Sequence, residues 1–121
     1  MTISRACELL NVSEHTLRYY EKQKLIHKVT RKGGKRDYSD EDIRWLKFIL
    51  RLKKTKMPLK EIKKYSELRY EGNSTISERK EMLLKHKTNL LEELSTLKSH
   101  LDFLENKIQI YEEMESEQRE I

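Results

Sequence analysis

The chain has 121 residues, of which 36% are hydrophobic and 39% are charged, and its formal net charge is +5. This composition is too polar for one large core, but it suits a helical protein with a long exposed helix. Residues 1–70 hold 19 Lys and Arg against 9 Asp and Glu, whereas residues 71–121 hold 7 against 12. A basic first part indicates a polyanionic partner, and the alternative is a solvated surface with uneven charge.

The chain shows no signature of a membrane or secreted protein. No apolar stretch reaches the roughly 18 residues of a membrane span, and the first ten residues lack the basic-then-apolar order of a signal peptide. Cys7 is the single cysteine, so no disulfide can form within the chain. We therefore expect a cytoplasmic protein without membrane contact.

Two short helices joined by a tight turn are predicted in the first 22 residues. Thr2 is a suitable N-cap for the first helix. One face of this helix repeats at helical spacing: Ile3, Ala6, Cys7 and Leu10. Asn11 tolerates the left-handed conformation of a tight turn, and Ser13 is a strong N-cap for a second helix that ends near Lys22. This arrangement is a helix-turn-helix.

The second helix has the properties of a helix that reads DNA. Residues at the start of a recognition helix contact base edges in the major groove, and cations or hydroxyls beside them bind phosphate. The candidate side chains are Ser13, His15, Thr16, Arg18, Tyr19 and Lys22. We expect Tyr20 to lie in the core and Tyr19 to be more exposed.

A basic β-hairpin is predicted next. Leu25–Thr30 and Arg36–Tyr38 are expected to be extended segments on either side of the Gly33-Gly34 turn. Cations surround this turn: Arg31, Lys32, Lys35 and Arg36. A hairpin of this kind beside a helix-turn-helix is a wing that follows the DNA backbone or minor groove. The alternative, a glycine loop that binds a nucleotide, lacks the strand-loop-helix context and the full glycine spacing.

Several motifs resemble the MerR family of bacterial transcriptional regulators. They are VSEHTLRYYEKQKLI, then RDYSDEDI, and later LKFILRLKKTKMPLKEIKKY, and the resemblance covers roughly residues 2–70. It implies a winged helix-turn-helix, with a second helical pair as a second wing in which Lys60 contacts phosphate. The full set of expected DNA contacts is Ser13, His15, Thr16, Arg18, Tyr19, Lys22, Arg31, Lys35, Arg36, Tyr38 and Lys60.

The chain departs from the family at two glycine positions. Glycine is common in the family where this chain has Asn11 and Lys56. Asparagine is a mild substitution, because it tolerates positive φ. Lys56 costs up to about 1 kcal/mol if its backbone is left-handed.

The second helical pair is predicted from Ser39 onward. Ser39 and Asp42 form a helix start of the capping-box type, and the helix is expected to end near Lys54. Its wide apolar face is expected to be core: Ile43, Trp45, Leu46, Phe48, Ile49, Leu50 and Leu52. Pro58 suits the first position of the next helix. Inward-facing residues of that helix are Leu59, Ile62 and Tyr65.

A long helix follows from about Ser77. Apolar residues recur with an average spacing of 3.5 residues, which predicts a coiled-coil seam. The residues of this dimer seam are Leu83, Leu90, Leu94, Leu97, Leu101, Leu104, Ile108 and Tyr111. Lys87 interrupts the repeat. A helix of about 35 residues would be roughly 50 Å long and could not bury this face against so small a head, so a second copy is the simplest partner.

The predicted organisation is mainly α. Residues 1–70 form the DNA-binding domain, 71–77 a linker, 78–112 the dimerisation helix, and 113–121 an acidic tail that frays or folds back. The family resemblance implies an antiparallel coiled coil with one head near each end, so that two recognition helices read a palindromic promoter site. It also implies that the dimer bends and untwists DNA, which lets RNA polymerase engage both promoter elements.

No catalytic, metal-binding or cofactor-binding motif is present, so we expect neither an enzyme nor a cofactor. The four histidines are scattered, and relatives that sense metals use cysteines near the end of the dimerisation helix, where this chain has none. Cys7 is more consistent with inert core than with a reactive thiol. A small-molecule effector, if there is one, would bind in an apolar pocket formed by Trp45, Tyr65, Leu68 and Tyr70.

Two other classes remain as alternatives. An architectural accessory protein of the excisionase type would share the winged head and occupy recombination sites. A coiled-coil interaction module would carry its basic surface incidentally and would not bind duplex DNA specifically at physiological salt. The second helical pair and the long seam favour the transcriptional regulator.

Overall fold

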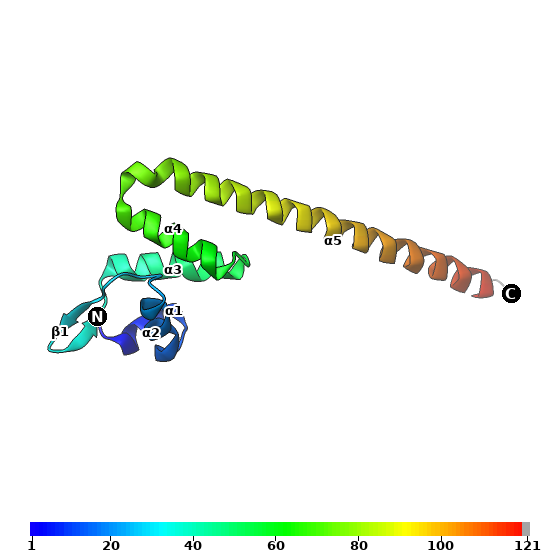
Figure 1. Ribbon diagram of the computed structural model, residues 1–121. Coiled ribbons are helices and arrows are strands. Elements are labelled where there is room, and N and C mark those ends of the chain that lie inside the picture. The colour runs from blue at the N-terminus through cyan, green and yellow to red at the C-terminus, as the bar shows by residue number, and fades with distance from the viewer. Residues whose placement is uncertain (120–121) are drawn as a thin grey trace. The chain divides into compact units, whose positions relative to one another are not determined.

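The computed structural model describes residues 1–119 as helices and one small hairpin (Figure 1). The elements in chain order are α1 (Ile3–Leu10), α2 (Glu14–Lys22), β1 (Thr30–Lys32), β2 (Lys35–Asp37), α3 (Asp40–Lys54), α4 (Leu59–Glu71), a 3₁₀ turn (Asn73–Thr75) and α5 (Ile76–Arg119). Two compact units are present. The head extends from Met1 to Met82, and the second unit is the rest of α5 from Leu83. No described helix is long and apolar enough to cross a membrane.

The caps predicted for α1 and α2 are confirmed. The Thr2 hydroxyl accepts a hydrogen bond from the backbone N–H of Arg5 at 3.1 Å, and the Ser13 hydroxyl accepts one from Thr16 at 3.1 Å. Asn11 ends α1 with φ 54° and ψ 49°, which is the left-handed conformation expected for the turn. The turn brings α2 back across α1, because both helices bury one apolar face in the head.

The hairpin is shorter than predicted. Its three antiparallel pairs join β1 to β2 and end at the pair Lys32–Lys35. Gly33 and Gly34 have φ of 58° and 77°, and two positive φ values are typical of the type I′ turn that matches strand twist. The segment from Leu25 to Val29, predicted to be extended, is not part of β1. Its apolar side chains Leu25, Ile26 and Val29 are buried in the core instead.

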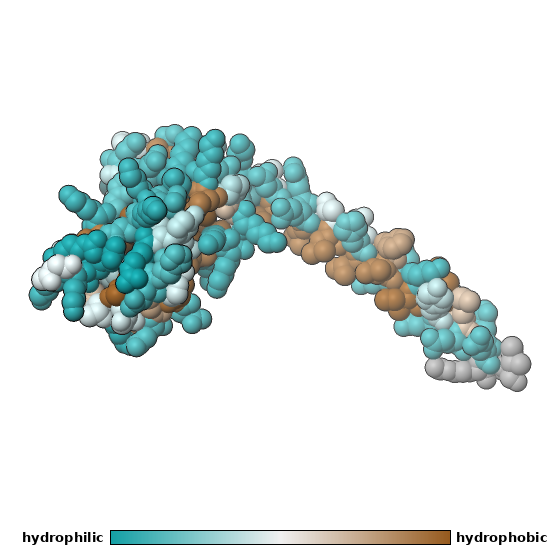
Figure 2. Space-filling model, turned by 60° about the horizontal axis from the view of Figure 1, so that its bottom comes forward, coloured by the Kyte–Doolittle hydropathy of each residue, from teal (hydrophilic) through white to brown (hydrophobic). Residues whose placement is uncertain are grey.

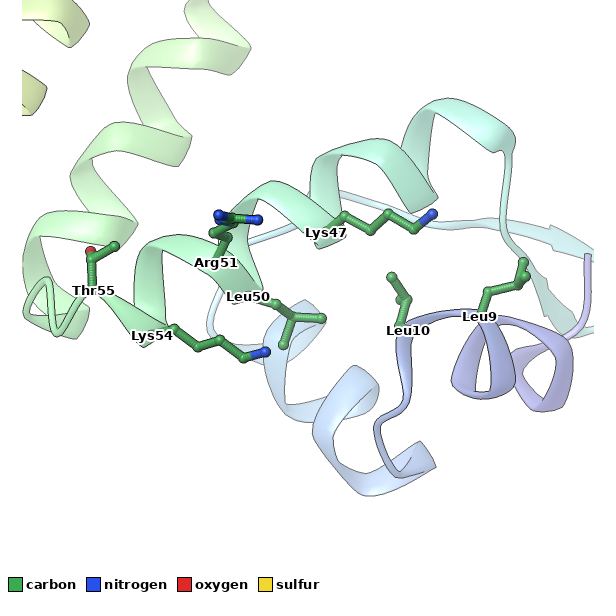
Figure 3. A pocket seen from close by; sticks show the side chains of 7 residues that line it. All are labelled: Leu9, Leu10, Lys47, Leu50, Arg51, Lys54 and Thr55. Atoms are coloured by element: carbon green, nitrogen blue, oxygen red, sulfur yellow. The ribbon is translucent and has the colours of Figure 1, made fainter.

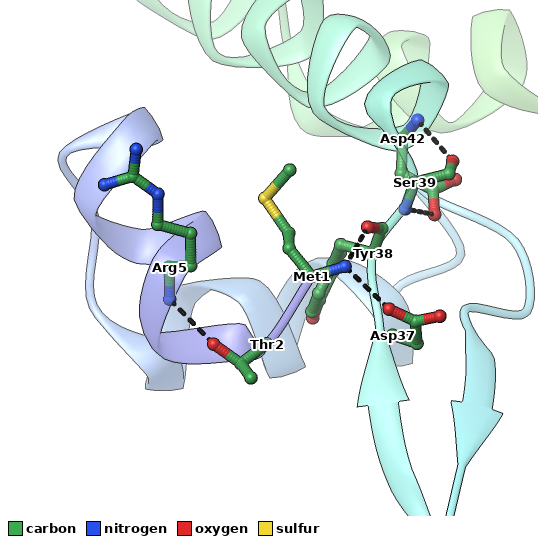
Figure 4. Close-up of polar contacts among 7 residues, drawn as sticks. All are labelled: Met1, Thr2, Arg5, Asp37, Tyr38, Ser39 and Asp42. Atoms are coloured by element: carbon green, nitrogen blue, oxygen red, sulfur yellow. Dashed lines mark hydrogen bonds and ion pairs between the residues drawn. The ribbon is translucent and has the colours of Figure 1, made fainter.

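The α3 and α4 pair completes the core of the head. Ser39 and Asp42 form the predicted capping box (Figure 4), and α3 ends at Lys54 as expected. The start of α4 is one residue later than predicted, because Pro58 is the N-cap and not the first helical residue. The core is built from α1 to α4 and the segments between them, and it includes Leu17, Tyr20, Leu46, Ile49 and Ile62, each at most 1% exposed.

Two residues predicted for this core are at the surface. Phe48 is 37% exposed and Leu59 is 36% exposed. The buried face of α3 is narrower than its apolar sequence suggested: Phe48 lies at its edge, with its ring 5.5 Å from that of Trp45 and 5.6 Å from that of Tyr65 on α4. Leu59 is the first residue of α4, where the chain enters from an exposed turn.

The long helix is longer than predicted at both ends. It begins at Ile76, inside the predicted linker, and it continues through the predicted acidic tail to Arg119. Between α4 and Arg119, the only break is Gly72, with φ 110°, and the 3₁₀ turn that follows it. Residues 120 and 121 of the predicted tail lie outside the described residues. The described part of the predicted tail is therefore helical as far as Arg119.

Most of the predicted seam is uncovered in the single chain. From Leu94 to Tyr111 its six residues are 50–61% exposed, while Leu83 and Leu90 are half-buried. Figure 2 shows apolar side chains, in brown, gathered along one side of α5. A row of large apolar side chains this exposed marks an interaction surface.

Candidate nucleic-acid interface

The exposed face of α2 is polar and cationic. His15, Arg18, Tyr19 and Lys22 are exposed at i, i+3, i+4 and i+7, which places them on one face. The opposite face is buried through Leu17 and Tyr20, as predicted for Tyr20. Tyr19 is 37% exposed, so its hydroxyl is available to a ligand.

Ser13 and Thr16 differ from the other predicted contacts on α2. Ser13 is exposed, but its hydroxyl already caps the helix and lies 3.0 Å from the hydroxyl of Thr16. Thr16 is half-buried. A second partner for either hydroxyl would have to share this local hydrogen bonding, so the exposed side chains further along α2 are better placed.

A cationic groove joins three elements of the head. It has a volume of about 470 Å³ and is lined by the start of α1, by α2 and by the hairpin: Thr2, Ile3, Ser4, Arg18, Arg31, Gly34, Lys35 and Arg36. Four of the predicted DNA contacts are among these residues, and the lining includes no carboxylate. The lining also includes the first residues of α1, and the N-terminus of a helix favours an anion. We call this the wing groove.

Two glutamates behind the wing groove hold its arginines. The Glu21 carboxylate accepts from Arg36 Nε at 2.8 Å and from Arg31 at 3.4 Å, and Glu14 accepts from Arg18 at 3.1 Å. Glu21 is only 16% exposed, so its pairs are partly shielded from water. These glutamates orient the guanidinium groups. The role of Glu21 could not be identified from the sequence, because its partners on the hairpin are 10 and 15 residues away.

The base of the wing is tied to the start of the chain (Figure 4). The Met1 amino group donates to the Asp37 carboxylate and to the Tyr38 carbonyl, both at 2.6 Å, and the Tyr38 amide donates to the Met1 carbonyl at 2.8 Å. The ammonium group beside Asp37 lowers the pKa of that carboxyl. These contacts place the hairpin next to the N-terminus of α1.

The prediction that Tyr38 contacts DNA is wrong for this structure. Tyr38 is 1% exposed, and its hydroxyl is buried without a hydrogen-bond partner. Burial raises the pKa of the phenol, with Arg36 acting in the opposite direction. Side chains alternate between the faces of a strand, so the residue after Asp37 turns inward to the core.

A second basic groove contains Lys60. It has a volume of about 460 Å³ and is lined by Gln23, Leu59, Lys60, Lys63, Lys64 and Glu67. Lys60 is exposed in the first turn of α4, and Lys63 donates to the side-chain carbonyl of Gln23 at 3.3 Å. The groove therefore joins the N-terminal half of α4 to the end of α2. This position fits the phosphate role predicted for Lys60, which stays a prediction.

The four residues predicted for an effector pocket form a packed cluster. Trp45, Tyr65 and Leu68 are each 7% exposed, and Tyr70 is 37% exposed. The Trp45 ring lies 6.1 Å from that of Tyr65 and 6.4 Å from that of Tyr70, and its indole N–H donates to the Leu25 carbonyl at 2.7 Å. That this cluster admits a small-molecule effector stays a prediction.

Cys7 is half-buried on α1. Burial raises the pKa of its thiol, and the nearby Glu14 adds to this effect. A raised pKa leaves less thiolate, which is the nucleophilic form. Within residues 1–119, no three or more His, Cys, Asp or Glu side chains are grouped so that they could hold a metal ion.

Two family models match the chain. The model described as MerR HTH family regulatory protein matches residues 1–68, and the one described as MerR, DNA binding matches residues 43–107. An uncharacterized HTH-type transcriptional regulator of Haemophilus influenzae is 37% identical over 112 residues, which are 92% of this chain and 83% of the relative. The HTH-type transcriptional regulator AdhR of Bacillus subtilis is 36% identical over 93 residues, 76% of this chain and 66% of the relative.

Solved structures agree with these matches. A putative MerR family transcriptional regulator from Listeria monocytogenes is similar with a TM-score of 0.84 and 32% identity, covering 93% of this chain and 86% of the other. HiNmlR, described as a MerR family regulator lacking the sensor domain and bound to promoter DNA, has a TM-score of 0.77 and 35% identity, with 95% and 92% covered. The chain thus belongs to the MerR family of DNA-binding transcriptional regulators.

Proposed function

We propose that this regulator binds palindromic promoter DNA as a homodimer and controls transcription initiation by distorting the duplex. The observation that carries the proposal is the wing groove, in which Arg18, Arg31, Lys35 and Arg36 converge beside the exposed face of α2. A duplex offers phosphates on both sides of its major groove. If α2 lies in the major groove of the DNA, the cations of the wing groove and Lys60 would bind the phosphates on either side of it.

The homodimer follows from the exposed seam of α5. Its six residues from Leu94 to Tyr111 would be covered by the same residues of a second copy, since a symmetric pair uses one surface twice. An antiparallel pair would hold one head near each end of the coiled coil. HiNmlR, which is similar over most of this chain, is described as bound to promoter DNA, and this supports the same ligand here.

DNA distortion would make the dimer a switch. Two heads held at a fixed separation engage both half-sites only if the duplex bends or untwists to match them, and the cost of deformation depends on the DNA sequence. A promoter whose elements are too far apart for RNA polymerase would become competent in the distorted form. Binding to an undistorted duplex, measured by the mobility of circularly permuted fragments, would contradict this step.

The test of DNA binding is the salt dependence of affinity. Arg18→Ala and Arg36→Ala should weaken binding to all duplexes and reduce the slope of log K against log salt by about 0.9 for each phosphate that the variant no longer binds. Lys35→Ala has a matched control in Lys98→Ala, which removes the same charge from an exposed position on α5. Equal effects of the two lysine variants, or unchanged slopes for both arginine variants, would remove the wing groove from the interface.

The test of the dimer is a charge at the centre of the seam. Leu97→Glu should convert the protein to a monomer in sedimentation equilibrium, because burying two carboxylates against each other is strongly unfavourable. The control is Thr96→Glu, an exposed neighbour outside the seam, which should leave the dimer intact. The monomer should also lose its preference for a palindrome over a single half-site.

A further inference from the structure

A groove separate from the wing groove lies between α1 and α3 of the head. Its volume is about 440 Å³, which is within the range of roughly 300–1,000 Å³ of sites that hold small molecules. Three leucines and three cations line it: Leu9, Leu10, Leu50, Lys47, Arg51 and Lys54. Figure 3 shows Leu10 and Leu50 pointing into the space between the two helices, with Lys47 and Lys54 extending beside them from α3. We call this the α1–α3 groove.

The leucines form an apolar floor that water can reach. Leu9 is 40% exposed at the end of α1, Leu50 is half-buried on α3, and Leu10 is 8% exposed between them. A single exposed leucine is ordinary on a protein surface. Here three leucines converge on one groove, so an apolar group that enters it would remove both itself and the leucines from water, which favours binding.

The cations beside this floor have no counterion within the chain. Lys47, Arg51 and Lys54 follow one another at i, i+4 and i+7, so they form a row along one face of α3. In the described part of the chain, no carboxylate forms an ion pair with any of them. Like charges at these spacings destabilise a helix. The helix dipole accounts for Arg51 and Lys54 in the last turn, but it does not account for Lys47, one turn earlier.

We propose that the α1–α3 groove binds a small amphipathic carboxylate, such as a medium-chain alkyl carboxylate. The apolar part of the ligand would cover Leu9 and Leu50. Its carboxylate would accept two hydrogen bonds from the Arg51 guanidinium, while Lys47 and Lys54 would add positive potential on either side. This site differs from the aromatic cluster predicted for an effector, and it accounts for the apolar and the cationic part of the groove together.

DNA and a membrane surface fit the α1–α3 groove less well. A phosphate backbone would satisfy the cations, but it carries no apolar group to cover Leu9 and Leu50. The wing groove, by contrast, includes hydroxyls and a helix N-terminus, which suit phosphate. A bilayer takes up apolar side chains that protrude, whereas Leu10 and Leu50 lie recessed between two helices and Leu9 alone is strongly exposed in this lining.

The position of the groove gives the ligand an effect on DNA binding. The last residues of α1 line the α1–α3 groove and its first residues line the wing groove, so Ser4 and Leu10 are about 9 Å apart along the helix. This separation is similar to the Debye length of about 10 Å at 0.1 M salt. A bound carboxylate would therefore weaken the positive potential at the wing groove. We expect DNA affinity to fall about 2- to 5-fold at low salt and less at high salt.

The selectivity of the groove can be tested by calorimetry with three ligands of equal chain length. Octanoate, octanol and octyltrimethylammonium would each be titrated into the full-length protein below their micelle concentrations. Octanoate should bind at least about tenfold more tightly than the neutral and the cationic ligand, because only its head group can pair with the cationic row. Equal affinity for the three ligands, or binding only to vesicles of anionic lipid, would overturn the proposal.

Two variants and one matched control locate the site. Arg51→Gln should weaken octanoate binding about 2- to 5-fold, since exposed ion pairs are weak, and Leu9→Asn should weaken it through the lost apolar contact. Arg44→Gln removes the same charge from an exposed position of α3 outside the lining and should have no effect. Circular dichroism would verify that each variant is folded. Equal effects of the two arginine variants would overturn the site.

Amide NMR spectra would show where octanoate binds. Shifts should be confined to the end of α1 and the second half of α3, and shifts centred on Trp45 and Tyr65 would overturn the proposal by placing the ligand at the aromatic cluster. An Arg51→Gln variant that loses DNA affinity and salt slope without octanoate would assign the cationic row to phosphate, and would also overturn it.

The binding of octanoate does not depend on the proposed function, and only its effect on DNA affinity does. A protein that binds octanoate at the α1–α3 groove but no promoter DNA would overturn the proposed function and support the site. Octanoate should weaken DNA binding by the unaltered protein, and DNA should weaken octanoate binding by the same factor. Unchanged DNA affinity at low salt with the groove saturated would overturn this coupling.

Discussion

Lys56 is a strained position whose replacement should stabilise the protein. It has φ 66° directly after the end of α3, where a left-handed residue is usually glycine. That conformation costs a residue with a Cβ roughly 1–2 kcal/mol. Glycine loses roughly 0.5–1 kcal/mol more backbone entropy on folding, which offsets part of the gain. Lys56→Gly should therefore raise the free energy of unfolding by about 0.5–1 kcal/mol.

The surroundings of Lys56 also indicate that Lys56→Gly raises the free energy of unfolding. Its side chain is exposed, and none of the described residues accepts a hydrogen bond or ion pair from it, so its removal breaks no polar interaction. Its backbone N–H, which donates to the Lys53 carbonyl at 3.0 Å, is kept in the glycine variant. The expected gain corresponds to a rise in melting temperature of about 2–5 °C for a chain of this size.

Urea unfolding at one fixed protein concentration would measure the change, because the stability of a dimer depends on concentration. The matched control is Lys64→Gly, which makes the same substitution at an exposed position in the middle of α4. There glycine should lower the free energy of unfolding by about 1 kcal/mol. A loss of stability in both variants would refute the argument from backbone strain at Lys56.

Three further substitutions test individual contacts of the head. Ser39→Ala removes the cap of α3 and its bond to the Asp42 amide, and it should cost about 1 kcal/mol in urea unfolding. Trp45→Phe leaves the Leu25 carbonyl without its indole donor and should cost about 1–3 kcal/mol, whereas an unchanged midpoint would mean that the bond contributes nothing. Tyr38→Phe removes a buried hydroxyl that has no partner, so stability at neutral pH should be unchanged or slightly higher. Folding raises the pKa of Tyr38, which means that the folded state favours the protonated phenol. The stability of the protein is therefore unaffected by this group below about pH 10 and falls as the pH rises above it and the phenol loses its proton. The variant should thus lose less stability than the unaltered protein as the pH rises above about 10, and equal losses would contradict this assignment.

Local chemistry explains why most element boundaries could be predicted from the sequence. Thr2, Ser13 and Ser39 each cap a helix through an amide three residues later, so the signal and its effect lie within one turn. The Gly33-Gly34 turn is equally local, because two adjacent positive φ values select glycine. The seam was visible for a related reason, since a repeat of 3.5 residues over many turns indicates a partner helix.

Predictions that depended on tertiary context were less accurate. Phe48 and Tyr38 are both aromatic, yet Phe48 is 37% exposed and Tyr38 is 1% exposed. The burial of Phe48 or of Tyr38 cannot be deduced from the residues next to it in the sequence, because it depends on which element packs against that position. The length of α5 is a different case. No Gly or Pro follows Gly72, and the acidic end is rich in good helix formers, so a helix to Arg119 was consistent with the sequence.

The wing groove shows how pairing changes the meaning of a charge count. Arg18, Arg31 and Arg36 count as free cations in the sequence, but the structure pairs them with Glu14 and Glu21. A guanidinium group has several N–H donors, so an arginine held by one carboxylate can still donate to phosphate. Glu21 thereby fixes the direction of two wing arginines and neutralises part of their charge. Such an arrangement favours recognition of the geometry of a DNA backbone over general attraction to any polyanion.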